Sequence, residues 1–225
     1  MFKKPKFNLI LLGPAGSGKG TQAELLVKKF GLQFVEAGDL VRKGAKKKTK
    51  LGYYLKKIHE SGKHLPDRII GQLIYENFKK LKKDTGVLVD GYPRTIGQAK
   101  DLEKIFKRFF PDFLKIAIYI KVSEKEATRR LLNRAVCPKC GKIFLTRDVR
   151  VCLKCGAKIE VRDYDQDKKA IKRRLKWFEE KVVPAINFYK KQKILIKING
   201  EQSIINVFKE IVDNLRNFIK RYDFD

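Results

Sequence analysis

GPAGSGKGT, residues 13–21, is the segment from which the architecture of this chain is most directly inferred. It follows the apolar run Phe7–Leu12 (FNLILL), which has the composition of a buried parallel strand, and it precedes helically spaced apolar residues in segment 21–30. In a strand–loop–helix unit of this kind, backbone N–H groups and the helix N-terminus bind phosphate groups. Glycine permits the left-handed backbone angles and the close approach of phosphate oxygens. The segment therefore predicts a phosphate-binding loop, in preference to a glycine-rich turn without a ligand.

The chemistry of this loop depends on its lysine. Lys19 is expected to reach the β- and γ-phosphates of a bound nucleotide. The strict pattern of such loops has serine or threonine directly after the lysine, whereas here Gly20 intervenes and Thr21 follows. The residues predicted to contact the triphosphate are Gly16, Ser17, Gly18, Lys19, Gly20 and Thr21.

Four further apolar runs have the composition of core strands. They occupy residues 32–35, 87–89, 116–122 and 193–198, and helical patterns separate them. The last helical pattern, residues 204–222, carries one apolar face. Alternation of strands and helices predicts a parallel sheet covered on both sides. We therefore expect an α/β fold of three layers (α/β/α) with a central five-stranded parallel sheet.

Two segments interrupt this alternation. Segment 37–81 contains helical patterns and no apolar run that would pair as a strand, and segment 137–163 carries cysteines and little helical periodicity. We interpret both as insertions at the open end of the sheet. The expected core is then formed by residues 1–36, 82–136 and 164–225.

The four cysteines of the chain form two similar motifs. CPKCG begins at Cys137 and CLKCG begins at Cys152, and eleven residues separate Cys140 from Cys152. CxxCG is a zinc-binding turn, and two such turns form a closed tetrahedral site, which is typical of a structural metal. An insertion this small buries little core, so metal binding would supply its folding free energy. Disulfides are the less favoured alternative, and iron fits the same geometry. The predicted zinc ligands are Cys137, Cys140, Cys152 and Cys155.

The charge of the chain is strongly positive. Lys and Arg total 53 against 25 Asp and Glu, a net charge of +28. A nucleic-acid partner, polyphosphate substrates or a lysine-rich solvated surface would each account for it. Most lysines are dispersed over helix faces, which favours the solvated surface, although the denser cluster in segment 42–50 stays open. No apolar run approaches the roughly 20 residues that span a bilayer, and we expect a cytoplasmic protein.

Beyond these patterns, the chain resembles the adenylate kinases over nearly its whole length. GPAGSGKGTQAELL (residues 13–26) resembles the ATP loop of the family, AGDLVR (37–42) its monophosphate-site motif, and DGYPRTIGQA (90–99) its most specific signature. The GxGKGT form of the loop is the variant found in that family. Segments 127–134, 162–175 and 183–189 match in order and approximate spacing.

The resemblance implies a monomeric kinase that transfers a phosphoryl group reversibly from ATP to AMP. It also implies Mg²⁺ with ATP, a structural zinc in a mobile lid, and a helical monophosphate-binding insertion. Membranes and specific nucleic acids are not expected as partners.

The resemblance also assigns roles to residues. Arg42 and Arg94 would hold the AMP phosphate, for which an arginine fork is well suited. Gln98 would read the edge of adenine, and Asp90 would orient waters on Mg²⁺ unless it caps a turn. The full catalytic set is Lys19, Asp90, Arg94, Arg130, Arg134, Arg162 and Arg174. The AMP-site set is Ala37, Arg42, Lys63, His64, Leu65, Gly91, Tyr92, Pro93, Arg94, Gln98, Arg162 and Arg174. Arg134, Ile143, Phe144 and Gln202 join the loop residues at the ATP site.

The sequence leaves three points open: which arginine contacts phosphate, which monophosphate is bound, and whether the protein is an enzyme or a nucleic-acid-binding protein. The family spacing points to Arg173, whereas the following helix aligns better with Arg174, which we favour. Ala37 stands where the family has threonine, as in UMP/CMP kinases, but Gln98 favours AMP because an amide discriminates bases by hydrogen bonding. A basic zinc-ribbon protein that binds nucleic acid is the alternative from another class, and the lid segment lacks the interleaved aromatic residues it would need.

Overall fold

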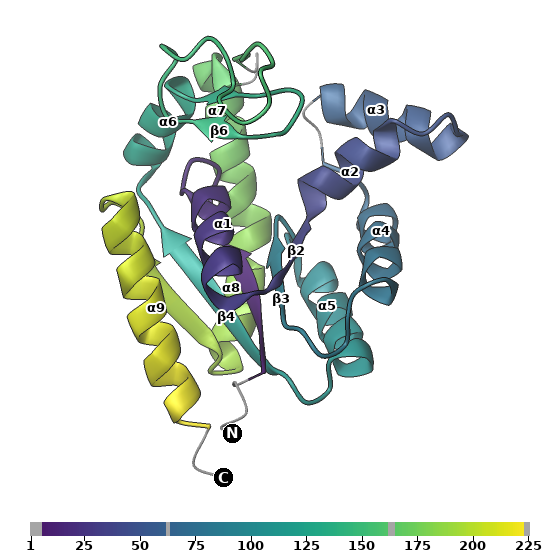
Figure 1. The fold of residues 1–225 in the computed structure, drawn as a ribbon, viewed down its shortest axis with the longest axis vertical. Helices are drawn as coiled ribbons and strands as arrows, with labels where there is room; N and C mark the ends of the chain where they lie inside the picture. Colours follow the sequence, from purple (N-terminus) through teal and green to yellow (C-terminus); the bar gives the residue numbers. More distant parts are fainter. Residues whose placement is uncertain (1–5, 62–63, 162–164, 223–225) are drawn as a thin grey trace.

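A five-stranded parallel sheet forms the centre of the protein (Figure 1). The computed structural model describes residues 6–61, 64–161 and 165–222. The strands lie in the order β2 (Gln33–Glu36), β3 (Val87–Asp90), β1 (Phe7–Leu12), β4 (Leu114–Lys121) and β7 (Leu195–Asn199). All neighbouring strands are parallel. The predicted five-stranded parallel sheet is confirmed.

Strand β1 lies in the middle of the sheet, and its side chains divide between two cores. Leu9 and Leu11 point to one core, whereas Ile10 and Leu12 point to the other, because successive side chains of a strand face opposite sides. All six residues of β1 are buried. Burial on both faces explains why the run FNLILL is mostly apolar instead of alternating; its polar residue, Asn8, is also buried, and its Oδ1 atom accepts from the N–H of Val87 at 2.9 Å.

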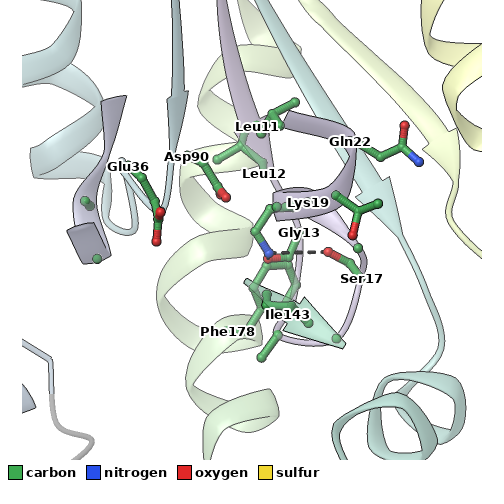
Figure 2. A pocket seen from close by; sticks show the side chains of 18 of the residues that line it. Leu11, Leu12, Gly13, Ser17, Lys19, Gln22, Glu36, Asp90, Ile143 and Phe178 are labelled. Carbon is green, nitrogen blue, oxygen red and sulfur yellow. Dashed lines mark hydrogen bonds between the residues drawn. The ribbon is translucent and has the colours of Figure 1, made fainter. Parts of the chain in front are cut away.

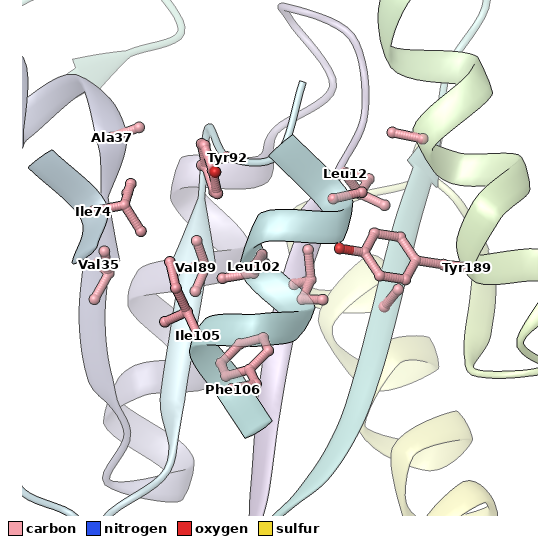
Figure 3. Close-up of a cluster of buried hydrophobic side chains, with 14 of the residues drawn as sticks. Leu12, Val35, Ala37, Ile74, Val89, Tyr92, Leu102, Ile105, Phe106 and Tyr189 are labelled. Atoms are coloured by element: carbon pink, nitrogen blue, oxygen red, sulfur yellow. The ribbon is translucent and has the colours of Figure 1, made fainter. Parts of the chain in front are cut away.

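Helices cover each face of the sheet. On one face, α1 (Lys19–Phe30) packs beside α9 (Ile204–Lys220). On the other face lie α4 (Asp67–Lys79), α5 (Ile96–Phe109) and α8 (Val183–Lys191). Figure 3 shows part of this second core, where side chains of the sheet meet Leu102, Ile105 and Phe106 of α5 and Tyr189 of α8. The three-layer arrangement agrees with the prediction.

The first predicted insertion is helical in the described part of the chain. It contains α2 (Ala37–Ala45), α3 (Lys50–Glu60) and α4. Helix α2 starts directly after β2, and α3 packs on it and projects from the edge of the molecule (Figure 1). The Thr49 side chain caps α3 by accepting a hydrogen bond from the N–H of Gly52 at 3.0 Å.

The second insertion follows α6 (Glu124–Leu132) and the short strand β5 (Ala135–Val136), and its own short strand β6 (Ile143–Phe144) pairs antiparallel with β5. It lies above the N-terminal end of α1 in Figure 1. The sequence of α6 predicts a capping box, and only half of it forms. The Ser123 hydroxyl accepts from the N–H of Glu126 at 3.2 Å, but the N–H of Ser123 donates to Glu201 instead of Glu126.

A long helical segment returns from the lid to the base of the sheet (Figure 1). It consists of α7 (Lys168–Trp177), a π-helical turn η2 (Phe178–Val182) and α8. Pro184 lies just after this turn and has no N–H to donate, which favours a local change in the hydrogen-bond pattern. The segment connects the lid end of the cleft directly to the core.

Candidate functional site

A cleft of about 870 Å³ lies at the carboxyl ends of the sheet strands, the usual ligand position in open α/β folds. The segment 13–21 forms one wall, and the two insertions contribute the others. Figure 2 shows Lys19 between Gly13 and Ser17, with Asp90 and Glu36 on the neighbouring strand ends and Ile143 of the lid nearby.

The glycines of the loop are required by its geometry. Gly16 and Gly18 have φ angles of 85° and 88°, in the left-handed region that favours glycine. A Cβ atom on Gly16 would lie 2.7 Å from the carbonyl oxygen of Ala127 in α6. The loop therefore packs closely against α6, and its shape depends on the absence of a side chain at position 16.

The side chain of Lys19 folds back against the loop and contacts its backbone. Its Nζ atom donates to the carbonyl oxygens of Gly13 at 2.7 Å and Pro14 at 2.9 Å, and it lies 3.3 Å from Ser17 Oγ. Burial lowers the pKa of Lys19 to about 8, and nearby arginines add to this effect while Asp90 opposes it. The ammonium group is thus partly desolvated, so it gains strongly from an anionic ligand.

Two carboxylates stand side by side at the strand ends. Asp90 on β3 pairs in register with Glu36 on β2. Burial raises the pKa of Asp90, and the Glu36 carboxylate raises it further, whereas Lys19 and Arg94 lower it. Asp90 therefore places a carboxylate beside the cations of the loop.

Arg94 is held by groups from the helical insertion and from its own turn. Its Nε atom donates to the carbonyl oxygen of Gly91 at 2.8 Å, and Nη1 lies 2.9 Å from His64 Nδ1. The His64 ring stacks on Trp177 of α7, with centroids 3.6 Å apart. Desolvation lowers the pKa of His64 to about 4, and Arg94 and Arg174 contribute to the shift. A neutral His64 accepts from Arg94 and connects the insertion to α7.

Gln98 has partners at both ends of its amide. Its Oε1 atom accepts from the N–H of Arg94 at 2.7 Å, and its Nε2 atom donates to Asp67 Oδ1 at 2.7 Å. Thr95 Oγ1 donates to the other oxygen of Asp67 at 2.6 Å. These bonds fix the orientation of the Gln98 amide, and within the described part of the chain they leave one donor and one acceptor site of the amide for another ligand.

One buried carboxylate joins two of the predicted arginines. Asp165 is fully buried, and its Oδ2 atom accepts from Arg134 Nε at 2.9 Å and from Nη2 at 2.5 Å. Its Oδ1 atom accepts from Arg174 Nη1 at 2.6 Å. Arg173 is 71% exposed and pairs with Asp167, whereas Arg174 lines the cleft. Asp165 thus sets the positions of two guanidinium groups at once.

Arg130 connects α6 to the loop and to the end of β7. Its Nε atom donates to Glu126 Oε1 at 2.6 Å, and its Nη2 atom donates to the carbonyl oxygen of Gly200 at 2.8 Å. Nη1 lies 3.5 Å from the carbonyl oxygen of Gly16. Arg130 therefore lies on the same side of the cleft as the loop.

The lid meets both the loop and the helical insertion. A Cβ atom on Gly20 would lie 3.7 Å from Ile143 Cδ1, and one on Gly141 would lie 3.4 Å from Arg42 Nη2. The first CxxCG turn therefore lies against the arginine of α2. The lid therefore approaches the cleft both beside the loop and beside α2.

The four cysteines converge in the lid. Their sulfur atoms all lie within 4.8 Å of one another. The closest pairs are 3.4 Å for Cys137 with Cys155 and 3.6 Å for Cys140 with Cys152, well beyond the roughly 2.05 Å of a disulfide bond. The N–H of Cys140 contributes most to lowering the pKa of Cys137, to about 6, which favours a thiolate. Four converging sulfur ligands suit a tetrahedral zinc ion.

Most of the residues expected at the site line the cleft. Phe144 and Tyr92 are not among the described residues that line the cleft. Leu145, the residue after Phe144 in the sequence, lines it instead, and Tyr92 is buried in the core. Lys63 and Arg162 lie outside the described residues. The expected residues that line the cleft are Gly16, Ser17, Gly18, Lys19, Gly20, Thr21, Ala37, Arg42, His64, Leu65, Asp90, Gly91, Pro93, Arg94, Gln98, Arg130, Arg134, Ile143, Arg174 and Gln202.

Several residues that the sequence analysis gave no role take part in this arrangement, among them Glu36, Asp165 and Trp177. No local motif marks them. Each of them contacts a partner that is distant in sequence or lies on another turn. For Glu36 alone, the position directly after a predicted strand indicated that the residue lies near the cleft.

Comparisons with known proteins agree with this geometry. The family model described as adenylate kinase matches residues 11–194. A protein of Petrotoga mobilis named adenylate kinase is 35% identical over 95% of this chain and 99% of its own length. Adenylate kinases of Fervidobacterium nodosum and Methanothrix thermoacetophila are each 36% identical, over 95% and 94% of this chain and 100% and 99% of their own lengths. In the described part of the chain, no helix has the length and apolar composition to cross a membrane.

Proposed function

Because the chain belongs to the adenylate kinase family and is therefore a nucleoside monophosphate kinase, we propose that it catalyses reversible, Mg²⁺-dependent phosphoryl transfer from ATP to AMP. One observation carries the proposal. Lys19 and the guanidinium groups of Arg42, Arg94, Arg134 and Arg174 all line one cleft, between a phosphate loop and a helical insertion. A site with this many converging cations suits two nucleotides that together carry several phosphate groups.

The reaction requires no general base. An oxygen of the AMP phosphate is already anionic at neutral pH and attacks the γ-phosphorus of ATP. The bond from that phosphorus to the bridging oxygen breaks, and its electron pair stays with the ADP that leaves. Catalysis then consists of in-line positioning and of cations around the transferred group. Lys19, Arg94, Arg130, Arg134 and Arg174 are proposed to supply these cations, together with Arg162.

The loop side of the cleft is proposed to bind ATP. The backbone N–H groups of residues 16–21 would surround its phosphates, and Lys19 would exchange its bonds to loop carbonyl oxygens for bonds to phosphate oxygens. Ile143 and Gln202 line the cleft near the loop and would contact the nucleoside, and we propose Phe144 as a further contact.

The insertion side is proposed to bind AMP. Arg42, Arg94 and Arg174 would hold its phosphate, and Gln98 would use its remaining donor and acceptor for adenine. Further proposed contacts are Ala37, Lys63, His64, Leu65, Gly91, Tyr92 and Pro93. The insertion that carries several of these residues is proposed to comprise residues 37–81.

Two metal ions belong to this proposal. Asp90 is a suitable group to orient the waters of Mg²⁺, which with ATP would neutralise phosphate charge. The four cysteines would hold a structural zinc ion that stabilises the lid, proposed as residues 137–163, against the core formed by residues 1–36, 82–136 and 164–225.

Closure of the lid and the insertion completes the proposed mechanism. A cationic cleft open to water would also hydrolyse ATP, so both insertions must close before transfer. The contacts of Ile143 with the loop and of Gly141 with Arg42 support closure over the cleft. We propose that lid opening limits turnover and that the enzyme acts as a monomer.

Coupled measurement of ADP formation tests the proposal. Purified protein is supplied with ATP and, in separate reactions, AMP, UMP or CMP, with Mg²⁺ present or replaced by a chelator. We expect Mg²⁺-dependent ADP formation with AMP as the preferred acceptor. A higher kcat/KM for UMP or CMP would contradict the substrate assignment. Metal analysis of the same preparation should give one zinc ion per chain.

A further inference from the structure

Glu36 brings a carboxylate to one of the arginines proposed to bind the monophosphate. It is the last residue of β2, and it lines the cleft. The Nη2 atom of Arg42 donates to Glu36 Oε1 at 3.1 Å and lies 3.3 Å from Oε2. One nitrogen of the guanidinium group is therefore shared between both oxygens of the same carboxylate.

The local backbone leaves room for this ion pair. A Cβ atom on Gly38 would lie 3.0 Å from Glu36 Oε1 and 3.2 Å from Arg42 Nη1. Contacts this short would force the two side chains to shift. The side chains of Glu36 and Arg42 are 34% and 25% exposed, so the pair is partly shielded from water and is stronger than a fully exposed pair.

The charge of Glu36 also acts on the rest of the site. Burial lowers the pKa of Arg94, and the carboxylates of Asp90 and Glu36 act in the opposite direction. Glu36 also contributes to the raised pKa of Asp90. The negative charge of Glu36 therefore acts across the region proposed to hold the monophosphate.

We propose that Glu36 competes with the phosphate of the nucleoside monophosphate for Arg42 and thereby weakens monophosphate binding. This inference rests on the proposed function, which assigns AMP to this side of the cleft. A phosphate that binds Arg42 through Nη2 must displace the carboxylate, because both anions accept from the same N–H groups. A carboxylate that stays close also repels the phosphate. Glu36 does not take part in the transfer itself; it sets how much AMP is needed to fill the site.

Glu36→Gln tests the competition, because the amide keeps the shape of the side chain and removes its charge. Calorimetric titration with AMP alone, without ATP or Mg²⁺, measures binding directly. We expect AMP to bind about tenfold more tightly to the variant, while the Kd for ATP changes less than twofold. In steady state, the KM for AMP should fall by a similar factor, with a much smaller change in kcat.

Asp39→Asn is the matched control. Asp39 Oδ1 lies 3.8 Å from the same Arg42 nitrogen, but Asp39 is bonded mainly to Lys43, at 2.6 Å, and it is not among the described residues that line the cleft. The control removes the same charge from a position three residues along the chain, at the start of α2, and we expect less than a threefold change in the Kd for AMP. Thermal unfolding of both variants verifies that they are folded.

The outcomes separate this inference from the proposed function. Unchanged or weaker AMP binding by Glu36→Gln would overturn the competition and leave the function standing. An equal decrease in the Kd for AMP in Asp39→Asn would also overturn the competition, since the loss of any nearby negative charge would then have the same effect. If ATP binds and AMP binds neither wild type nor variant, the assignment of AMP to the site is wrong.

Discussion

The phosphate loop and the lid are neighbouring walls of the same cleft, yet different interactions hold them in shape. The loop follows the fully buried strand β1 and packs with Gly16 against α6, so its shape comes from the core. The lid contains one strand of two residues, β6, which pairs with β5 just before the lid, and its four cysteines converge on one point. The loop is thus built on the core, whereas the lid, which we propose to move, carries its own local stabilisation.

The largest expected effect comes from the loop. Lys19→Met should lower kcat about 10³-fold or more, because the cation proposed to contact the transferred phosphoryl group is lost. The core should stay folded, since the removed ammonium group is partly desolvated and lies at the cleft. ADP formation measures the first effect and thermal unfolding the second. A variant that keeps most of the wild-type rate would contradict the role of Lys19.

Removal of one cysteine should act on the lid alone. Cys152→Ala deletes a buried thiol, and we expect it to lose zinc and to lower kcat/KM more than tenfold. Hydrogen exchange should become fast in the lid and stay slow in the sheet. Leu153→Ala is the control, because this neighbouring side chain is 90% exposed and its removal should leave the zinc content unchanged. Faster exchange across the sheet of Cys152→Ala would mean that the core, too, depends on the metal.

Substitution of two glycines with similar backbone angles, one in the loop and one in the lid, compares the two regions directly. Gly16 and Gly156 have φ angles of 85° and 71°, so alanine costs about 1–2 kcal/mol of strain at either position. At Gly16 the Cβ atom also meets the carbonyl oxygen of Ala127, whereas at Gly156 nothing lies within 4 Å. We expect Gly16→Ala to lower the unfolding free energy of the core in urea by at least 2 kcal/mol, roughly the strain plus the clash. Gly156→Ala should instead weaken zinc retention against a chelator. An equal loss of core stability in both variants would contradict the distinction.

A further effect is a pH dependence that arises from Lys19 in the loop. The pKa of Lys19 is lowered to about 8 in the folded protein, so between about pH 8 and 10.5 the unfolded chain binds more protons. The contribution of Lys19 to the unfolding free energy therefore rises with pH across this range. Affinity for ATP should fall over the same range as the free enzyme loses the charge of Lys19. Denaturant unfolding and ATP titration at several pH values, with Lys19→Met as the reference, measure both slopes.

The sequence predicted the core and the loop well because their signals are local. FNLILL followed by a glycine-rich segment identifies β1 and the loop, and each predicted strand begins and ends within two residues of an observed one. The cysteine motifs predicted the convergence of four thiols for the same reason, since each CxxCG turn is self-contained.

Contacts between distant segments could not be predicted in this way. The sharing of Asp165 by Arg134 and Arg174 depends on how the chain returns from the lid. The half-formed capping box has a similar cause, because Glu201 comes from another part of the chain. Such partners follow from the packing of whole elements, and a pattern of residue types within one segment carries no information about them.

The stacked rings of His64 and Trp177 give the protein a built-in optical reporter. Trp177 is the only tryptophan of the chain, so the entire indole emission arises at the junction between the helical insertion and α7. Any outward swing of the insertion separates the two rings and changes the surroundings of that indole. Stopped-flow fluorescence of the unlabelled wild-type protein therefore tests whether this side of the cleft opens and closes, and measures the rate.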